Sequence, residues 1–217
     1  WRSDYLGTGR IGAVNYLGEY ENKRVVLKVQ GVKPAVSEQF MIEAFRKQNK
    51  SKIIRPPFIY RHLSWNEKGG YEAFLMEEVT GDKIIESGKI LTATEIDDFM
   101  RVYKEYKANC INQPWLPKPE TDPNDDMADR LKKMMAEVKP NSPMRHPDDW
   151  DLAKKAYKNL KRIWAGESPQ FLHGHFSAED LMRQGGEVVL FSNLFWKWKY
   201  PFSSRLSWPA RWPTTDR

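Results

Sequence analysis

The sequence predicts an α+β fold with two lobes, in which a small antiparallel sheet and one helix precede a mostly helical second half. Runs of β-forming residues dominate residues 1–80, whereas apolar residues at helical spacing dominate residues 92–166. The change from β-forming runs to helical spacing of apolar residues comes after Gly81. We therefore expect an N-lobe over residues 1–79 and a C-lobe over residues 80–217.

The composition is that of a globular protein, with 217 residues of which 40% are hydrophobic and 29% charged. A net charge of +6 suits an anionic ligand, but a modest excess of lysine is ordinary surface, so nucleic acid is not an expected partner. The single cysteine, Cys110, provides no disulfide framework and indicates a reducing, cytoplasmic setting. No apolar run reaches the roughly 18 residues of a membrane helix, so no membrane association is expected.

In the first half we expect strands at residues 14–17 and 24–29, followed by a helix at residues 37–48 with Ser37 as its N-cap. Two more strands are expected near residues 58–60 and 71–76.

In the second half, Thr92 and Glu95 form a capping box that opens a helix. A further helix is expected from Asp122, and another over residues 147–166. Short apolar runs follow at 171–172 and 188–191, and the aromatic residues of 194–202 are expected in the core rather than in a stacking platform for nucleic acid or sugar.

Residues 7–12 contain a G-x-G-x-x-G pattern made by Gly7, Gly9 and Gly12. Glycines let the backbone approach phosphate oxygens and present N–H groups to them. A dinucleotide-binding fingerprint would open a helix at once, and a P-loop needs Gly-Lys-Ser/Thr, so the β-like residues that follow fit neither. The pattern resembles the glycine-rich loop of protein kinases, which lies between two strands.

The kinase resemblance requires a lysine on the following strand, and Lys28 supplies it after Val25-Val26-Leu27. It implies that Lys28 binds the α- and β-phosphates and that a glutamate on the next helix orients the lysine. Glu43 is our candidate for that glutamate, with Glu38 as the alternative.

Residues 74–81 resemble the hinge that joins the two kinase lobes. This resemblance implies that backbone groups around Met76, Glu77 and Val79 bind the adenine edge of a nucleotide.

Residues 172–181 read Leu-His-Gly-His-Phe-Ser-Ala-Glu-Asp-Leu, similar to the H-G-D-x-x-x-x-N loop of aminoglycoside phosphotransferases and related small-molecule kinases. His173 and Gly174 match, whereas His175 occupies the position of the catalytic aspartate and Asp180 that of the metal-binding asparagine. The aspartate that this family uses for Mg²⁺ is replaced at Ser192-Asn193. The resemblance covers roughly residues 5–200.

The resemblance implies ATP-dependent phosphotransfer to the hydroxyl of a small molecule, with ATP and Mg²⁺ as cofactors. His175 would be the base, since a neutral imidazole can accept a proton. Asp180 would hold Mg²⁺ with Asn193, although a neutral oxygen is a poor ligand for this ion.

Two other interpretations remain open. The chain could be a pseudokinase that keeps the fold and binds nucleotide or a protein partner. His173, His175 and Asp180 could alternatively hold zinc, although the sequence offers no compelling third ligand.

Overall fold

The computed structural model describes the following parts of the chain: residues 4–8, 12–85, 92–120, 151, 154–155, 158–159, 162, 167–174, 176 and 180–200.

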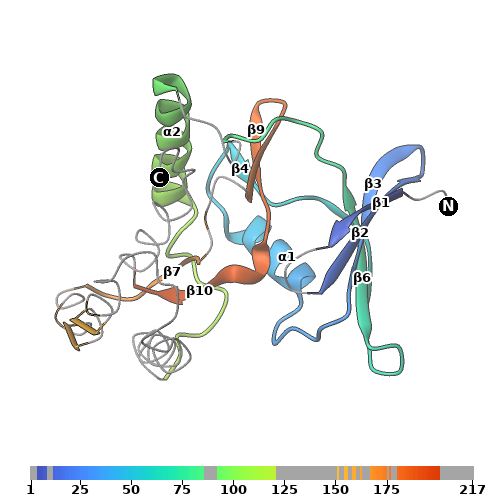
Figure 1. Cartoon of the computed structure of the whole chain (residues 1–217), viewed down its shortest axis with the longest axis horizontal. Helices are drawn as coiled ribbons and strands as arrows, with labels where there is room; N and C mark the ends of the chain where they lie inside the picture. Colours follow the sequence, from blue (N-terminus) through green and yellow to red (C-terminus); the bar gives the residue numbers. More distant parts are fainter. Residues whose placement is uncertain are drawn as a thin grey trace.

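A five-stranded antiparallel sheet forms the first half of the molecule (Figure 1). In spatial order its strands are β1 (Asp4–Thr8), β2 (Ala13–Tyr20), β3 (Lys23–Gln30), β6 (Tyr71–Glu77) and β5 (Ile59–Asn66). Glu21 and Asn22 close the β2–β3 hairpin with φ values of 50° and 59°, the left-handed conformations of a type I′ turn.

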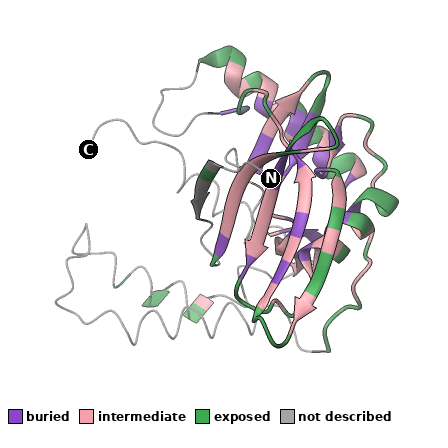
Figure 2. Ribbon diagram, turned by 90° about the vertical axis from the view of Figure 1, so that its right-hand side faces the viewer, coloured by how far each residue is buried: buried purple, intermediate pink, exposed green. Residues whose placement is uncertain are grey.

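Buried and partly exposed residues share the strands of this sheet, as Figure 2 shows. Along β6, Glu72, Phe74 and Glu77 are buried whereas the residues between them are partly exposed. This near-alternation is expected of a sheet with one covered face.

Helix α1 (Glu38–Gln48) lies between the sheet and the second half of the molecule (Figure 1). Ser37 is its N-cap residue, as predicted, although the Ser37 side chain makes no capping hydrogen bond. Met41, Ile42 and Phe45 are buried, at the three-to-four-residue spacing of one helix face.

The described second half contains one long helix and several short strands. Helix α2 (Ala93–Asn109) begins at the predicted capping box, in which Glu95 N–H donates to Thr92 Oγ1 at 3.2 Å and Thr92 N–H donates to Glu95 Oε2 at 2.8 Å. Strand β7 (Gln170–His173) pairs antiparallel with β10 (Trp196–Lys199).

The remaining strands form a three-stranded sheet in the order β4-β9-β8. Strands β8 (Leu181–Gln184) and β9 (Glu187–Leu190) form a hairpin, and β4 (Ile54–Arg55) pairs parallel with β9. A strand of the first half thus joins a sheet of the second half. The 3-10 helix η2 (Asn193–Phe195) follows β9.

The main core lies where α1, α2 and these short strands meet. Its buried side chains are contributed by both halves of the chain: Met41, Phe45, Ile54, Ile84, Ile85, Phe99, Val102, Tyr106, Cys110, Phe171, Leu181, Val188, Leu190 and Trp196. Trp196 is 1% exposed and packs on Phe45, with ring centroids 4.6 Å apart. The prediction that the aromatic run belongs to the core is confirmed for this residue.

The predicted strands of the first half and the helix at 37–48 are confirmed, whereas β1, β4, β8 and β10 were not predicted. The helix expected from Asp122 lies outside the described residues. Of the helix expected over 147–166, the described residues 151, 154–155, 158–159 and 162 are helical. Within the described chain, no helix combines the length and the apolar character needed to cross a bilayer.

Candidate functional site

Lys28 extends from the middle of β3 toward α1. It lies between Asn15 of β2 and Phe74 of β6 in the strand register. Its Nζ forms an ion pair with the carboxylate of Glu38, the first residue of α1, and lies 5.5 Å from the ring centroid of Phe74. The two charged side chains are 17% and 5% exposed, so the pair is largely shielded from solvent and each charge depends on the other.

The structure corrects the choice of Glu43 as the partner of Lys28. Glu43 is exposed and accepts a hydrogen bond from Gln39 within the same helix. Five residues along a helix rotate a side chain by about 140°, so Glu38 and Glu43 face different directions. Because Glu38 is in the first turn, it is the glutamate that faces β3.

Two more polar side chains are buried beside this pair. Gln30 and Glu72 are each 1% exposed and lie directly opposite one another in the β3–β6 register. Burial raises the pKa of the Glu72 carboxyl above its ordinary value; nearby Glu38 adds to the rise and Lys28 opposes it. Because side chains alternate along a strand, the sequence could have placed Gln30 on the same face of β3 as Lys28. The position of Glu72 depends on the pairing of β3 with β6, which the sequence pattern does not contain.

The glycine-rich segment connects β1 to β2, between two strands as predicted. Gly7 lies in β1 opposite Asn15, next to an irregularity in the register. Gly12 has a φ of +68°, in the left-handed region that favours glycine, and its carbonyl accepts a hydrogen bond from the N–H of Gly31 at 3.4 Å. Gly9 lies outside the described residues.

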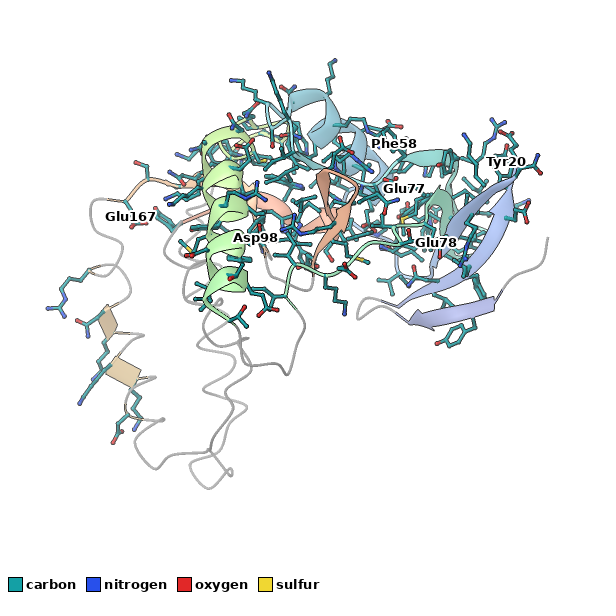
Figure 3. The ribbon with its side chains drawn as sticks, turned by 90° about the horizontal axis from the view of Figure 1, so that it is seen from above. Tyr20, Phe58, Glu77, Glu78, Asp98 and Glu167 are labelled. Atoms are coloured by element: carbon teal, nitrogen blue, oxygen red, sulfur yellow. The ribbon has the colours of Figure 1, made fainter. Side chains whose placement is uncertain are left out.

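Glu77, at the end of β6, is held by hydrogen bonds to Phe58 and an ion pair with Arg55. Its N–H donates to the carbonyl of Phe58 at 2.9 Å, and its Oε1 accepts from the N–H of Phe58 at 2.8 Å. Figure 3 shows Phe58 and Glu77 close together at the edge of the sheet. The N–H of Glu77 is therefore not available to an adenine in this conformation, and the adenine contacts expected of Met76 and Val79 stay predictions.

Arg55 connects Glu77 to the second half of the molecule. Its guanidinium binds the carboxylate of Glu77, with Nη2 3.1 Å from Oε2, and its Nε donates to Glu187 of β9 at 2.5 Å. Sequence reasoning missed this connection because Arg55 and Glu187 are 132 residues apart and no local pattern relates them.

Asp180 and Ser192 are brought together at the ends of the β8–β9 hairpin. The N–H of Phe191 donates to the carbonyl of Asp180 at 2.8 Å, and Ser192 Oγ donates to Asp180 Oδ1 at 2.5 Å. Asp180 is 5% exposed. Ser192 has a φ of +57°, a left-handed conformation that is uncommon for serine and that strains the backbone at this position.

His173 is fully buried and holds the backbone around Ser192. Its Nε2 lies 3.0 Å from the carbonyl oxygen of Phe191 and 2.9 Å from that of Ser192. Both partners are acceptors, so Nε2 carries the proton. Its backbone N–H donates to Tyr106 Oη at 2.7 Å, and burial raises the pKa of that phenol well above its ordinary value. His173 is therefore a structural residue.

Asn193 is buried with its amide engaged on both sides. Its Nδ2 donates to the carbonyl of Leu190 at 2.9 Å, and its Oδ1 accepts from Trp196 Nε1 at 3.1 Å. Ser192, rather than Asn193, contacts Asp180. The structure thus gives Asn193 a packing role instead of the metal-ligand role that we expected.

His175, the candidate base, lies outside the described residues. Within the described ranges, no group of three or more histidine, cysteine or acidic side chains is placed to hold a metal ion. Since His173 Nε2 is engaged by backbone carbonyls, the structure gives the zinc interpretation no support.

A search of solved structures relates this architecture to small-molecule kinases. A thermostable mutant of the aminoglycoside phosphotransferase APH(4)-Ia, in a ternary complex with ADP and hygromycin B, superposes with a TM-score of 0.65 at 10% identity, over 93% of this chain and 69% of that chain. The chain has the fold of an aminoglycoside phosphotransferase. The predicted two-lobed, protein-kinase-like α+β architecture is confirmed at the level of the fold.

Two further structures share this phosphotransferase fold. Spectinomycin phosphotransferase APH(9)-Ia, in complex with ADP and spectinomycin, aligns with a TM-score of 0.56 at 9% identity, over 90% of this chain and 64% of that chain. Choline kinase from Cryptosporidium parvum Iowa II aligns with a TM-score of 0.55 at 14% identity, over 93% of this chain and 60% of that chain. No family model and no curated protein matches the sequence. At these identities the likeness establishes the phosphotransferase fold alone.

Proposed function

We propose that the chain is an ATP-dependent phosphotransferase that acts on a hydroxyl group of a small molecule. The observation that carries this proposal is the Lys28–Glu38 ion pair within a phosphotransferase fold. Phosphoryl transfer depends mainly on positioning and on stabilising developing negative charge. An ammonium group fixed at the centre of the sheet by a buried carboxylate provides both.

The proposal gives a part to five features of the candidate site. Lys28 binds the α- and β-phosphates, and Glu38 orients its ammonium. The backbone of the glycine-rich segment covers the phosphates, and the backbone of Val79 contacts the adenine edge. His175 accepts the proton of the acceptor hydroxyl while the acceptor oxygen bonds to the γ-phosphorus, the bond to the β,γ-bridging oxygen breaks and ADP leaves.

The neighbours guide the choice of acceptors to test. The structures named above are of kinases for aminoglycosides, spectinomycin and choline. Acceptor-dependent release of ADP should therefore be measured with amino sugars, other sugars and amino alcohols. We expect at least one acceptor to stimulate ADP release by the native chain, and Lys28→Ala to reduce that rate by about 100-fold or more, as for loss of a charge-stabilising group.

The variants separate the parts of the proposal. Unchanged turnover in Lys28→Ala would contradict the role given to the ion pair, and unchanged turnover in His175→Ala would remove His175 as the base. Binding of ATP without turnover for any acceptor would favour the second candidate function.

That second candidate is a catalytically inactive module on the same fold, which binds nucleotide or a protein partner. The hydrogen bond from Ser192 to Asp180 favours it, because the carboxylate expected to take part in catalysis is already engaged inside the protein.

A further inference from the structure

Asp180, Ser192 and Asn193 occupy the positions at which the resemblance to small-molecule kinases implies Mg²⁺. Mg²⁺ prefers octahedral coordination by oxygen, and in nucleotide sites it usually has one or two carboxylates besides phosphate oxygens and water. Among these three residues Asp180 alone has a carboxylate. It is 5% exposed, and its Oδ1 accepts a hydrogen bond from the Ser192 hydroxyl at 2.5 Å.

The backbone holds Ser192 in this arrangement. Its φ of +57° places it in the left-handed region, and its carbonyl oxygen lies 2.9 Å from His173 Nε2, which carries the proton. From this backbone position the Ser192 hydroxyl reaches Asp180 and donates a hydrogen bond to its carboxylate. A metal ion bound to the Asp180 carboxylate would find beside it the neutral hydroxyl of Ser192, a weak ligand for Mg²⁺, in place of a second carboxylate.

Asn193 cannot compensate for the missing carboxylate. Its Oδ1 accepts from Trp196 Nε1 and its Nδ2 donates to Leu190, both within the buried core. Turning the amide outward would leave the Trp196 indole N–H buried without that partner, which costs about 1–3 kcal/mol. The residues present therefore do not fit Mg²⁺ at this position.

We propose that the chain binds nucleotide phosphates without a tightly held divalent cation, because the one carboxylate at the expected metal position accepts a hydrogen bond from Ser192 and the amide of Asn193 is engaged in the core. This inference rests on the proposed nucleotide binding and specifies how that same site operates.

Calorimetric titration of the native chain with ATP, in EDTA and in millimolar Mg²⁺, tests the inference. We expect dissociation constants that agree within about twofold. Tightening by Mg²⁺ of about tenfold or more, equivalent to about 1.4 kcal/mol, would overturn the inference and leave the proposed function intact. Absence of ATP binding in both conditions would overturn both.

Substitution of Ser192 provides a matched second test. Ser192→Asp restores a second carboxylate, and Ser192→Asn is its neutral control; both residue types tolerate the left-handed conformation. We expect ATP affinity to become Mg²⁺-dependent in Ser192→Asp and to stay independent of Mg²⁺ in Ser192→Asn, with thermal unfolding confirming that both variants fold. If Mg²⁺ tightened ATP binding to the same extent in the native chain and in both variants, a metal would be bound elsewhere and the inference would be contradicted.

Discussion

Lys28 and Glu38 form an ion pair whose surroundings make each charge dependent on the other. The Glu38 side chain is 5% exposed, so neither partner can be lost without leaving a charge in a poorly solvated place. Loss of one partner of such a pair costs far more than loss of an exposed ion pair. The pair should therefore contribute both to stability and to phosphate binding.

Glu38→Gln tests this contribution, with Glu43→Gln as its matched control. The Glu38 variant should lose about 3 kcal/mol of unfolding free energy, because Lys28 is left without its buried counter-ion. The Glu43 variant should change by no more than about 0.5 kcal/mol, since Glu43 is exposed. Urea unfolding monitored by circular dichroism measures both; a larger loss in the Glu43 variant would contradict our assignment.

Glu72 should make stability depend on pH. Burial raises its pKa above the ordinary value of 4.5, and Glu38 adds to the rise, while Ser37, His62 and Lys28 act against it. The folded protein thus holds the Glu72 proton to a higher pH than the unfolded chain does. Its contribution to stability falls as the pH rises from about 4.5 through the raised pKa.

Glu72→Gln removes this ionisation. At pH values above the raised pKa of Glu72, we expect the variant to be more stable than the native chain. This difference in stability should shrink as the pH falls toward 4.5. Thermal unfolding across this pH range measures the difference. A variant that is less stable than the native chain at neutral pH would show that the ionised Glu72 carboxylate stabilises the fold.

Sequence reasoning predicted the residues of the site where a short pattern carried the information. The glycine-rich segment and Lys28 follow from spacing along one chain segment. The choice of Glu43 over Glu38 was wrong, because it depends on which turn of α1 faces β3, and no local pattern contains that information. The Ser192–Asp180 contact was missed because the two residues are 12 apart in the sequence and no local pattern relates their side chains.

At the scale of elements, the connection after β6 packs tightly on β8. A β-carbon added to Gly81 would lie 1.5 Å from the carbonyl oxygen of Arg183, which is backbone and cannot rotate away. The isolated bridge between Lys83 and Met182 and the hydrogen bond from the Arg183 N–H to the Asp82 carbonyl at 2.8 Å fix the same contact. This glycine is required by a close approach of two chain segments.

Gly81→Ala should therefore destabilise the fold by about 2–3 kcal/mol, since the added carbon forces β8 away from the connection. Gly186→Ala is the control, because a β-carbon there would meet no atom within 4 Å. Chemical denaturation distinguishes the two variants. Equal stability of both would contradict the close packing of Gly81 on β8.

Helices and long strands were predictable from the sequence, whereas the short strands were not. The capping box at Thr92 and the eight-residue strands β2 and β3 contain enough residues to show a period. Strands β4, β8 and β10 have two to four residues, and their pairing is set by segments far away in the sequence. A local pattern cannot contain that information.

At the scale of the whole molecule, the two halves are joined by more than the connection after β6. Ile54 and Arg55 of β4 pair with Val188 and Val189 of β9, and Arg55 binds both Glu77 and Glu187. The boundary at residues 79–80 stays a prediction. The fold as a whole was predictable because its motifs occur in a fixed order along the chain.

Arg55→Met should weaken this junction. Removal of the guanidinium leaves Glu77, which is 8% exposed, without its counter-ion, so we expect a loss of about 3 kcal/mol. Lys33→Met is the control, because the Lys33–Glu67 pair is exposed by 57% and 73% and should contribute less than about 1 kcal/mol. Unfolding in guanidinium chloride compares the stability of the two variants. Similar losses of unfolding free energy in both would contradict a structural role for Arg55.

The structure of the chain bound to a non-hydrolysable ATP analogue tests the central claim most directly. Our account predicts phosphate oxygens within hydrogen-bonding distance of Lys28 Nζ, with the adenine next to the backbone of Val79. A nucleotide bound elsewhere on the molecule, or phosphates without contact to Lys28, would contradict it.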